Sequence, residues 1–182
     1  MKRCFFALWP DAALAEALHA LGKAVHADCG GRLMRRDTLH LTLAFLGDLP
    51  SDRVGEAMRV ADAIAAEPFD LTLDRLGYWK HNRILWAGGV PHAGHSMSPR
   101  LTFLADALGA GLREAGFSLD ARSFAAHVTL LRDARCAGKP LMPQPFAWQV
   151  RDFVLAESKP SREGARYEIV ARWPLVPPQV LK

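Results

Sequence analysis

A four-residue pattern occurs twice in this chain, as His40-Leu41-Thr42-Leu43 and as His127-Val128-Thr129-Leu130. Each copy lies in an apolar run, residues 39–46 and 126–131, that is typical of a β-strand. Side chains alternate across a strand, so the histidine and threonine of each copy share one face and the apolar residues share the other. A single His-x-Thr is more often structural than catalytic. Because the pattern is duplicated, we predict that the two polar faces meet in one cleft and supply acid–base groups and hydroxyl donors together.

The composition is that of a soluble globular protein. Half of the 182 residues are hydrophobic and 23% are charged. No apolar stretch approaches the roughly 20 residues that span a bilayer, so we expect no membrane contact. The apolar start of the chain is too short for a signal peptide and ends at Pro10-Asp11. The net charge of +4 is compatible with a polyanionic partner but equally with a mildly basic surface.

The three cysteines, Cys4, Cys29 and Cys136, are odd in number and show no paired spacing. This argues against a disulfide framework and against a zinc site. It also fits a reducing compartment, and we therefore expect a cytoplasmic protein.

Helix and strand signals alternate irregularly along the chain. In the first half Asp11 opens a helix, Ser51 caps another after Pro50, and apolar runs predict strands over residues 3–8, 38–46, 69–73 and 83–87, the last two as neighbours. In the second half Ser98-Pro99 begins a helix that ends near Gly116, and strands follow over residues 126–131, 153–157 and 166–173, with a turn at 161–164. A helix followed by a His-x-Thr strand thus occurs twice. We predict an α+β fold, mainly antiparallel, in which one domain of residues 1–182 forms two similar lobes around a central cleft.

The extended motifs, residues 39–47 and 124–132, resemble the two signatures of the 2H phosphoesterases. The similarity is greatest to the RNA 2′,3′-cyclic phosphodiesterase branch, also called 2′-5′ RNA ligase. It extends over nearly the whole chain and includes residues 3–7, 84–86, 157–158 and 166–167. The resemblance implies a bilobal fold with a basic groove, and as partner an RNA with a 2′,3′-cyclic phosphate end, tRNA halves among the candidates. The expected reaction opens that end to a 2′-phosphate, with 2′-5′ ligation as a related activity. We expect the protein to be a monomer.

By match to the family motif, His40 is expected to be the proton donor and His127 the proton acceptor. The chemistry is consistent with such a division, because attack of water on a cyclic phosphodiester needs one group to take a proton and another to deliver one. An imidazole with a pKa near 6.5 can do either at neutral pH. Thr42 and Thr129 can donate hydrogen bonds to the phosphate oxygens. No carboxylate cluster accompanies the histidines, so we expect neither a metal nor another cofactor.

Two residues beyond the motifs are less constrained by the pattern. Arg132 could bind the substrate phosphate, since a guanidinium recognises phosphate bidentately, although strict alternation turns it away from His127. Phe45 occupies the matching place in the first copy and could pack against a base, but we predict that it packs in the core. Trp79 could stack on a base or pack between the lobes, and Arg35 and Arg36 could contact phosphate or only solvent.

Two other functions remain compatible with the sequence. A 2H phosphoesterase acting on another cyclic nucleotide or on an oligonucleotide end would use the same four His and Thr side chains. A non-catalytic RNA-binding protein could also keep the fold, but binding alone does not need two titratable groups that face each other.

Overall fold

The computed structural model describes residues 1–89, 98–119, 124–161 and 164–177. Its α-helices are α1 (Ala12–Cys29), α2 (Ser51–Asp62) and α3 (Pro99–Glu114), and a short 3₁₀ turn covers Arg36–Thr38. Its strands are β1 (Lys2–Leu8), β2 (Arg32–Leu33), β3 (Leu41–Leu49), β4 (Phe69–Leu73), β5 (Arg75–Trp79), β6 (Ile84–Gly88), β7 (Val128–Arg132), β8 (Phe146–Val150), β9 (Asp152–Ser161) and β10 (Gly164–Pro174).

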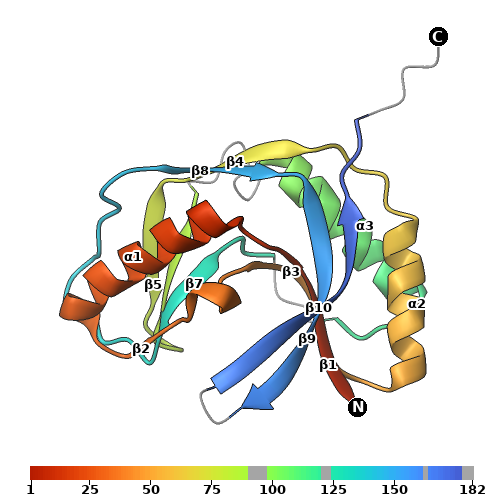
Figure 1. The fold of residues 1–182 in the computed structure, drawn as a ribbon, viewed down its shortest axis with the longest axis horizontal. Helices are drawn as coiled ribbons and strands as arrows, with labels where there is room; N and C mark the ends of the chain where they lie inside the picture. The colour runs from red at the N-terminus through yellow and green to blue at the C-terminus, as the bar shows by residue number, and fades with distance from the viewer. Residues whose placement is uncertain (90–97, 120–123, 162–163, 178–182) are drawn as a thin grey trace.

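One long antiparallel sheet runs in the order β10-β9-β1-β3-β7-β6-β5, and β2 pairs with β7 beside it. Its middle is narrow, because β3 and β7 are joined through the single pair Leu41 and Val128. The junction divides the sheet into a first lobe of β1, β3, β9 and β10 and a second lobe of β2, β5, β6 and β7. Helix α1 packs against β7 in the second lobe, and α2 and α3 cover the first (Figure 1). The α+β prediction with two lobes is confirmed.

Local signals account for the helix ends. The Asp11 side chain accepts a hydrogen bond of 2.8 Å from the Leu14 amide and caps α1 as predicted. Pro99 occupies the first turn of α3, and Gly116, with φ of +76°, follows its last turn. Ser51 is the first residue of α2, and Pro50 holds the cap position in its place.

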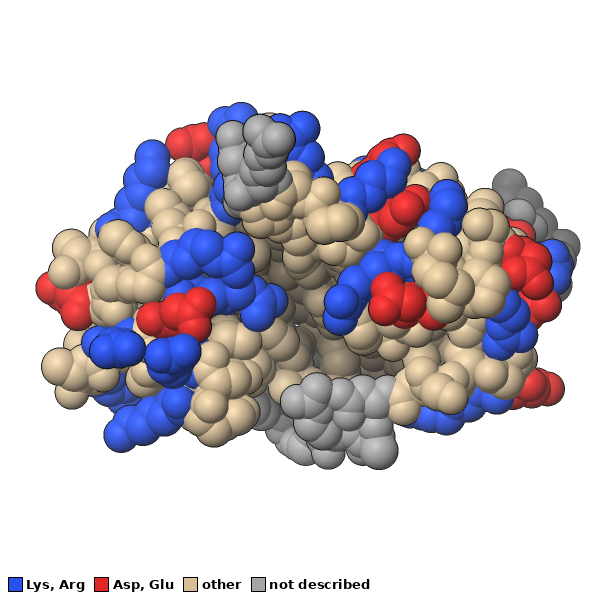
Figure 2. All heavy atoms as spheres, turned by 90° about the horizontal axis from the view of Figure 1, so that it is seen from below, with Lys and Arg blue, Asp and Glu red and all other residues tan. Residues whose placement is uncertain are grey.

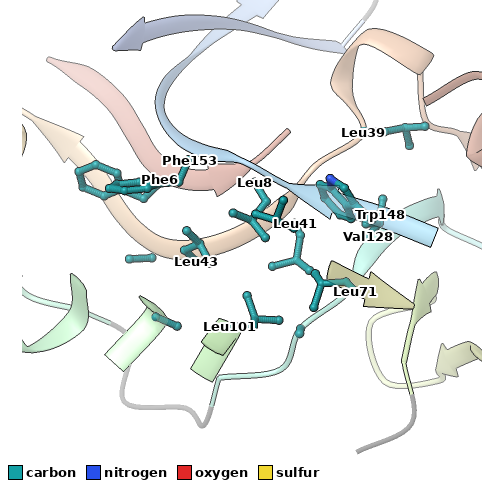
Figure 3. Packing of buried hydrophobic residues seen from close by; sticks show 14 of the residues in the cluster. Phe6, Leu8, Leu39, Leu41, Leu43, Leu71, Leu101, Val128, Trp148 and Phe153 are labelled. Carbon is teal, nitrogen blue, oxygen red and sulfur yellow. The ribbon is translucent and has the colours of Figure 1, made fainter. Parts of the chain in front are cut away.

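The hydrophobic core lies on the side of the sheet away from the His-x-Thr faces. Leu41, Leu43 and Val128 from the two motif strands pack there with Leu101 of α3 (Figure 3). Leu41, Val128 and Leu101 are completely buried. Burying one such side chain contributes about 1.5–3 kcal/mol, so the motif strands are held in place from their apolar side.

Strand pairing differs from the prediction in one region. The strand over residues 69–73 forms as β4, but its neighbour is β8 in a separate two-stranded sheet, not the strand over residues 83–87. That strand, β6, lies between β5 and β7. The strands β5 and β8 were not predicted, because their short sequences carry weak alternation and their partners are distant in the chain.

The expectation that the cysteines form no disulfide is wrong, because Cys29 and Cys136 are bonded to each other. Cys29 ends α1, and Cys136 follows β7 at a sequence separation of 107. The two are brought together because β2 pairs with β7 and because the Arg135 amide donates to the Cys29 carbonyl at 2.8 Å. The positions of the cysteines in the sequence do not predict such a long-range pairing. Within the described ranges, no helix is both long and apolar enough to cross a membrane.

Candidate active site

The single pair that joins the lobes also brings the two motifs together. Leu41 is paired with Val128 in antiparallel register. Continuing this register by one residue in each direction sets His40 opposite Thr129 and Thr42 opposite His127. All four side chains therefore project from the same face of the sheet, and all four line one cavity of about 60 Å³. The predicted meeting of the two polar faces is present in the structure.

Both histidines are oriented by the same local device. The Nδ1 atom of His40 lies 2.7 Å from the carbonyl oxygen of Thr38, and that of His127 lies 2.7 Å from the carbonyl oxygen of Ala125. A carbonyl only accepts, so each ring carries its proton on Nδ1 when neutral. The Nε2 atom of each ring is then the one available to a substrate. The two halves of the site are equivalent in this respect.

Aromatic rings surround the histidines. Trp9 stacks on the His40 ring with centroids 5.3 Å apart, Phe5 lies at 4.8 Å, and Tyr167 meets it edge-on at 5.1 Å. On the other side, Trp79 packs edge-on against His127 at 4.6 Å. Trp79 is thus a neighbour of the candidate base.

This enclosure changes the protonation of both rings. Burial lowers the pKa of His40 from 6.5 to about 4, and the charges of His127 and Arg132 act in the same direction. Burial also lowers the pKa of His127, with Arg132 as a further cause. The hydrogen bonds to the carbonyls of Thr38 and Ala125 oppose these shifts only in part. In the absence of a ligand, both rings are therefore neutral at pH 7.

Arg132 reaches the cavity because β7 is irregular. The pairing of β7 with β6 shifts between Trp86, which faces Thr129, and Leu85, which faces Leu131. One residue of β6 thus opposes two of β7, which is a β-bulge and reverses the alternation beyond it. Arg132 therefore shares the face of Thr129 and lines the same cavity. Strict alternation alone had placed it on the opposite face.

The first lobe contains the same irregularity, which overturns the prediction for Phe45. In the pairing of β1 with β3, Ala7 faces Thr42 and Phe5 faces Phe45. Two steps along β1 therefore correspond to three steps along β3, which contains one extra residue. Phe45 consequently shares the face of Thr42. Its side chain is 44% exposed and lies in the cleft rather than in the core. Phe45 and Arg132 hold matching positions, each three residues after the motif threonine.

Two larger cavities open on either side of the four motif residues, and Figure 2 shows the molecule hollowed here with lysine and arginine side chains on both rims. The first, of about 430 Å³, shares His40, Thr42 and Arg132 with the small cavity. The second, of about 690 Å³, begins at His127 and is bordered by the rings of Trp79 and Phe124. A chain-like ligand could pass from one to the other across the histidines.

The remaining histidines and arginines of interest are distributed as follows. His19 and His26 bond to the carbonyls of Met34 and Gly31 and do not themselves border these cavities, whereas His81 borders the second cavity. Arg36 pairs with Glu16, and Arg35 borders the first cavity but is bound to Asp37. His92 and His95 lie outside the described residues. In the described part of the chain, no three His, Cys, Asp or Glu side chains are grouped so that they could hold a metal ion.

Sequence reasoning missed Trp9, Phe5 and Tyr167, the rings around His40. A signal for two of them exists, since Phe5 and Ala7 of β1 form a second buried face with Val154 and Ala156 of β9, and Trp9, directly after β1, packs against it. Nothing local in the sequence connects that face to His40, because the connection runs through the pairing of β1 with β3.

Two lobes that each present a His-x-Thr pair to a shared cavity define the architecture of the 2H phosphoesterases. Comparison with known proteins is more specific. The family model described as LigT like Phosphoesterase matches residues 8–86. The RNA 2′,3′-cyclic phosphodiesterase of Escherichia coli K12 is 34% identical over 96% of this chain and 97% of its own, and that of Archaeoglobus fulgidus is 26% identical over 91% and 96%. The crystal structure of E. coli LigT complexed with 3′-AMP superposes with a TM-score of 0.85 at 33% identity, covering 96% of this chain and 98% of that one. This chain belongs to the LigT-like phosphoesterase family.

Proposed function

We propose that this protein hydrolyses RNA 2′,3′-cyclic phosphate ends to 2′-phosphomonoesters, with His40 as proton donor and His127 as proton acceptor. The observation that carries the proposal is the opposition of two His-Thr pairs across one 60 Å³ cavity. The volume suits a phosphate group, and relatives that match over nearly the whole chain are RNA 2′,3′-cyclic phosphodiesterases.

In the proposed reaction, His127 removes a proton from water as the water oxygen bonds to phosphorus. The bond from phosphorus to O3′ breaks, and His40 delivers a proton to O3′, so that the phosphate stays on O2′. Each transfer by a positioned group typically contributes about 10²–10⁴-fold. Thr42, Thr129 and Arg132 would hold the non-bridging oxygens, which remain negative throughout.

The lowered pKa of His127 is consistent with its role as proton acceptor in the empty site. The lowered pKa of His40 is consistent with its role as proton donor only when substrate is bound. A neutral His127 can accept a proton at Nε2 without prior deprotonation. His40, with a pKa of about 4 in the empty site, is a poor donor at pH 7. A bound phosphodiester places a negative charge beside both rings, which raises the pKa of His40 and offsets the positive charge of Arg132. Substrate binding thus prepares the acid.

The decisive experiment uses an RNA oligonucleotide with a 2′,3′-cyclic phosphate end, incubated in EDTA with wild type, His40→Ala, His127→Ala and the control His26→Ala, whose histidine is exposed and distant from the cavity. We expect a 2′-phosphate from wild type and the control alone. Formation of a 3′-phosphate would keep the site but show that O2′, not O3′, is the leaving oxygen. Turnover of other cyclic nucleotides but not of RNA would favour the wider phosphoesterase function, and binding without any turnover would favour the RNA-binding function.

We further propose that the protein works as a cytoplasmic monomer on such RNA ends. A reducing cytoplasm would not by itself lead us to expect the disulfide between Cys29 and Cys136. Counting free thiols on protein purified without oxygen tests whether this disulfide is present in the cell, and light scattering tests the oligomeric state. A dimer at micromolar concentration would contradict the second part.

A further inference from the structure

The cavity of about 430 Å³ beside the catalytic centre carries more positive charge than one phosphate needs. Besides Arg132, which also lines the small cavity, it is bordered by Arg3 of β1 and Arg32 of β2. Neither Arg3 nor Arg32 borders the small cavity. These two arginines therefore lie beyond the place where the reacting phosphate is expected.

Arg32 and Arg132 face each other directly in the pairing of β2 with β7. Like charges in that position destabilise a sheet, by up to about 1 kcal/mol. In the described part of the chain, neither side chain forms an ion pair with a carboxylate, whereas the nearby Arg35 is held by Asp37. An anionic ligand between the lobes would remove this repulsion.

Both outer arginines are positioned on the cavity wall. An Nη1 atom of Arg32 lies 3.0 Å from where a Cβ on Gly164 would stand, so the side chain extends across the cavity from the second lobe to the β9–β10 hairpin of the first. The Arg3 guanidinium lies 5.3 Å from the centroid of the exposed Phe45 ring. Both guanidinium groups therefore lie along the wall of this cavity.

The cavity on the other side of the histidines differs in character. Its described lining contains one arginine, Arg113, together with Asp106 and a set of apolar side chains (Ile84, Leu119, Phe124 and Trp79). A second phosphate is therefore favoured on the Arg3–Arg32 side, where positive charge is concentrated.

We propose that Arg32 and Arg3 form a second phosphate subsite, which binds the phosphodiester on the 5′ side of the terminal nucleoside. The inference rests on the proposed function and names its substrate as an oligonucleotide rather than a nucleoside 2′,3′-cyclic phosphate. The occupant is the phosphate of the strand being cleaved; the phosphate of a separate RNA strand has the same chemistry and is distinguished by the test.

The test compares adenosine 2′,3′-cyclic phosphate with its 5′-phosphorylated form. Wild type should prefer the 5′-phosphorylated substrate by about 10–100-fold in kcat/KM, as expected for one charge-assisted contact. In Arg32→Ala the preference should fall to about threefold or less. Arg59→Ala is the matched control, because Arg59 is an exposed arginine on α2 that borders neither cavity, and it should keep the wild-type preference.

An equal loss of kcat/KM on both substrates in Arg32→Ala would overturn the subsite, because it would mean that Arg32 acts on the reacting phosphate or on the fold. If Arg32→Ala changed the kinetics only when a second RNA strand was added, the subsite would belong to that strand and not to the strand being cleaved. The melting temperature of Arg32→Ala without ligand should equal or exceed that of wild type, since a like-charge contact is removed.

Binding separates failure of the subsite from failure of the proposed function. Calorimetry should give a Kd for adenosine 3′,5′-bisphosphate about tenfold or more below that for adenosine 3′-phosphate, and Arg32→Ala should reduce the difference to about threefold or less. This readout needs no turnover. If wild type left the cyclic end unhydrolysed but still bound the bisphosphate more tightly than the 3′-phosphate, the proposed reaction would be rejected and the anion subsite kept. Equal Kd values for the two ligands in wild type would reject the subsite.

Discussion

The burial of His40 should make the stability of the protein depend on pH in a defined window. The ring has a pKa of about 4 in the folded protein against 6.5 in an unfolded chain. Between these values the unfolded state binds a proton that the folded state does not, so the free energy of unfolding falls as the pH is lowered through the window. Above pH 6.5 neither state is protonated, and below pH 4 both are, so the effect is confined to this interval.

The expected size follows from the shift. One pKa unit corresponds to 1.36 kcal/mol, so the full effect of His40 is about 3 kcal/mol, of which about 2.5 kcal/mol is lost by pH 4.5. Carboxylates also titrate in this range, and a variant is needed to isolate the histidine. The loss between pH 7 and pH 4.5 should be about 2.5 kcal/mol smaller in His40→Gln than in wild type.

Urea denaturation followed by circular dichroism at the two pH values measures this double difference. His26→Gln, which removes an exposed histidine at the end of α1, is the control for the loss of a histidine outside the site. His127→Gln should reduce it as well, because burial lowers the pKa of His127 in the same direction. A double difference below about 0.5 kcal/mol for His40→Gln would show that the ring is not enclosed as described and would refute the reasoning.

Four further substitutions test the site and the frame that supports it. Thr42→Val and Thr129→Val should each lower kcat/KM on a 2′,3′-cyclic phosphate by about 10–100-fold while leaving the melting temperature nearly unchanged, since each removes one donor to the phosphate. Cys136→Ser, which opens the disulfide to Cys29, should lower the free energy of unfolding by about 2–4 kcal/mol under non-reducing conditions, as measured by urea denaturation. Gly31→Ala should cost about 2 kcal/mol or more in the same assay, because φ is +85° and the new Cβ would stand 2.5 Å from a backbone oxygen of β7.

The sequence was sufficient for those parts of the fold that depend on local patterns. Asp11 and Pro99 mark helix starts through their own chemistry, and the alternation around His40 and His127 separates a polar face from an apolar one. The duplicated motif also predicted that the two polar faces meet.

Features that depend on distant pairing could not be predicted in this way. The strand β4 carries clear alternation, yet the choice between β6 and β8 as its neighbour depends on how the whole sheet closes. Cys29 and Cys136 become partners only after β2 has paired with β7. Each of these contacts involves residues far apart in the chain, and no local pattern encodes them.

The bulges are the most consequential of these hidden features, because they decide which side chains complete the site. By register and hydrogen bonding the two His-Thr pairs are equivalent, so the motifs alone cannot distinguish proton donor from acceptor. The difference enters at the residue that each bulge turns into the cleft, an aromatic ring at Phe45 and a guanidinium at Arg132. Phe45 and Arg132 both border the first cavity, so the equivalence of the two halves is broken on that side of the histidines and a bound nucleotide has a preferred direction. That direction determines which ribose oxygen lies near His40, so the end group of the product reports on the bulges as much as on the histidines.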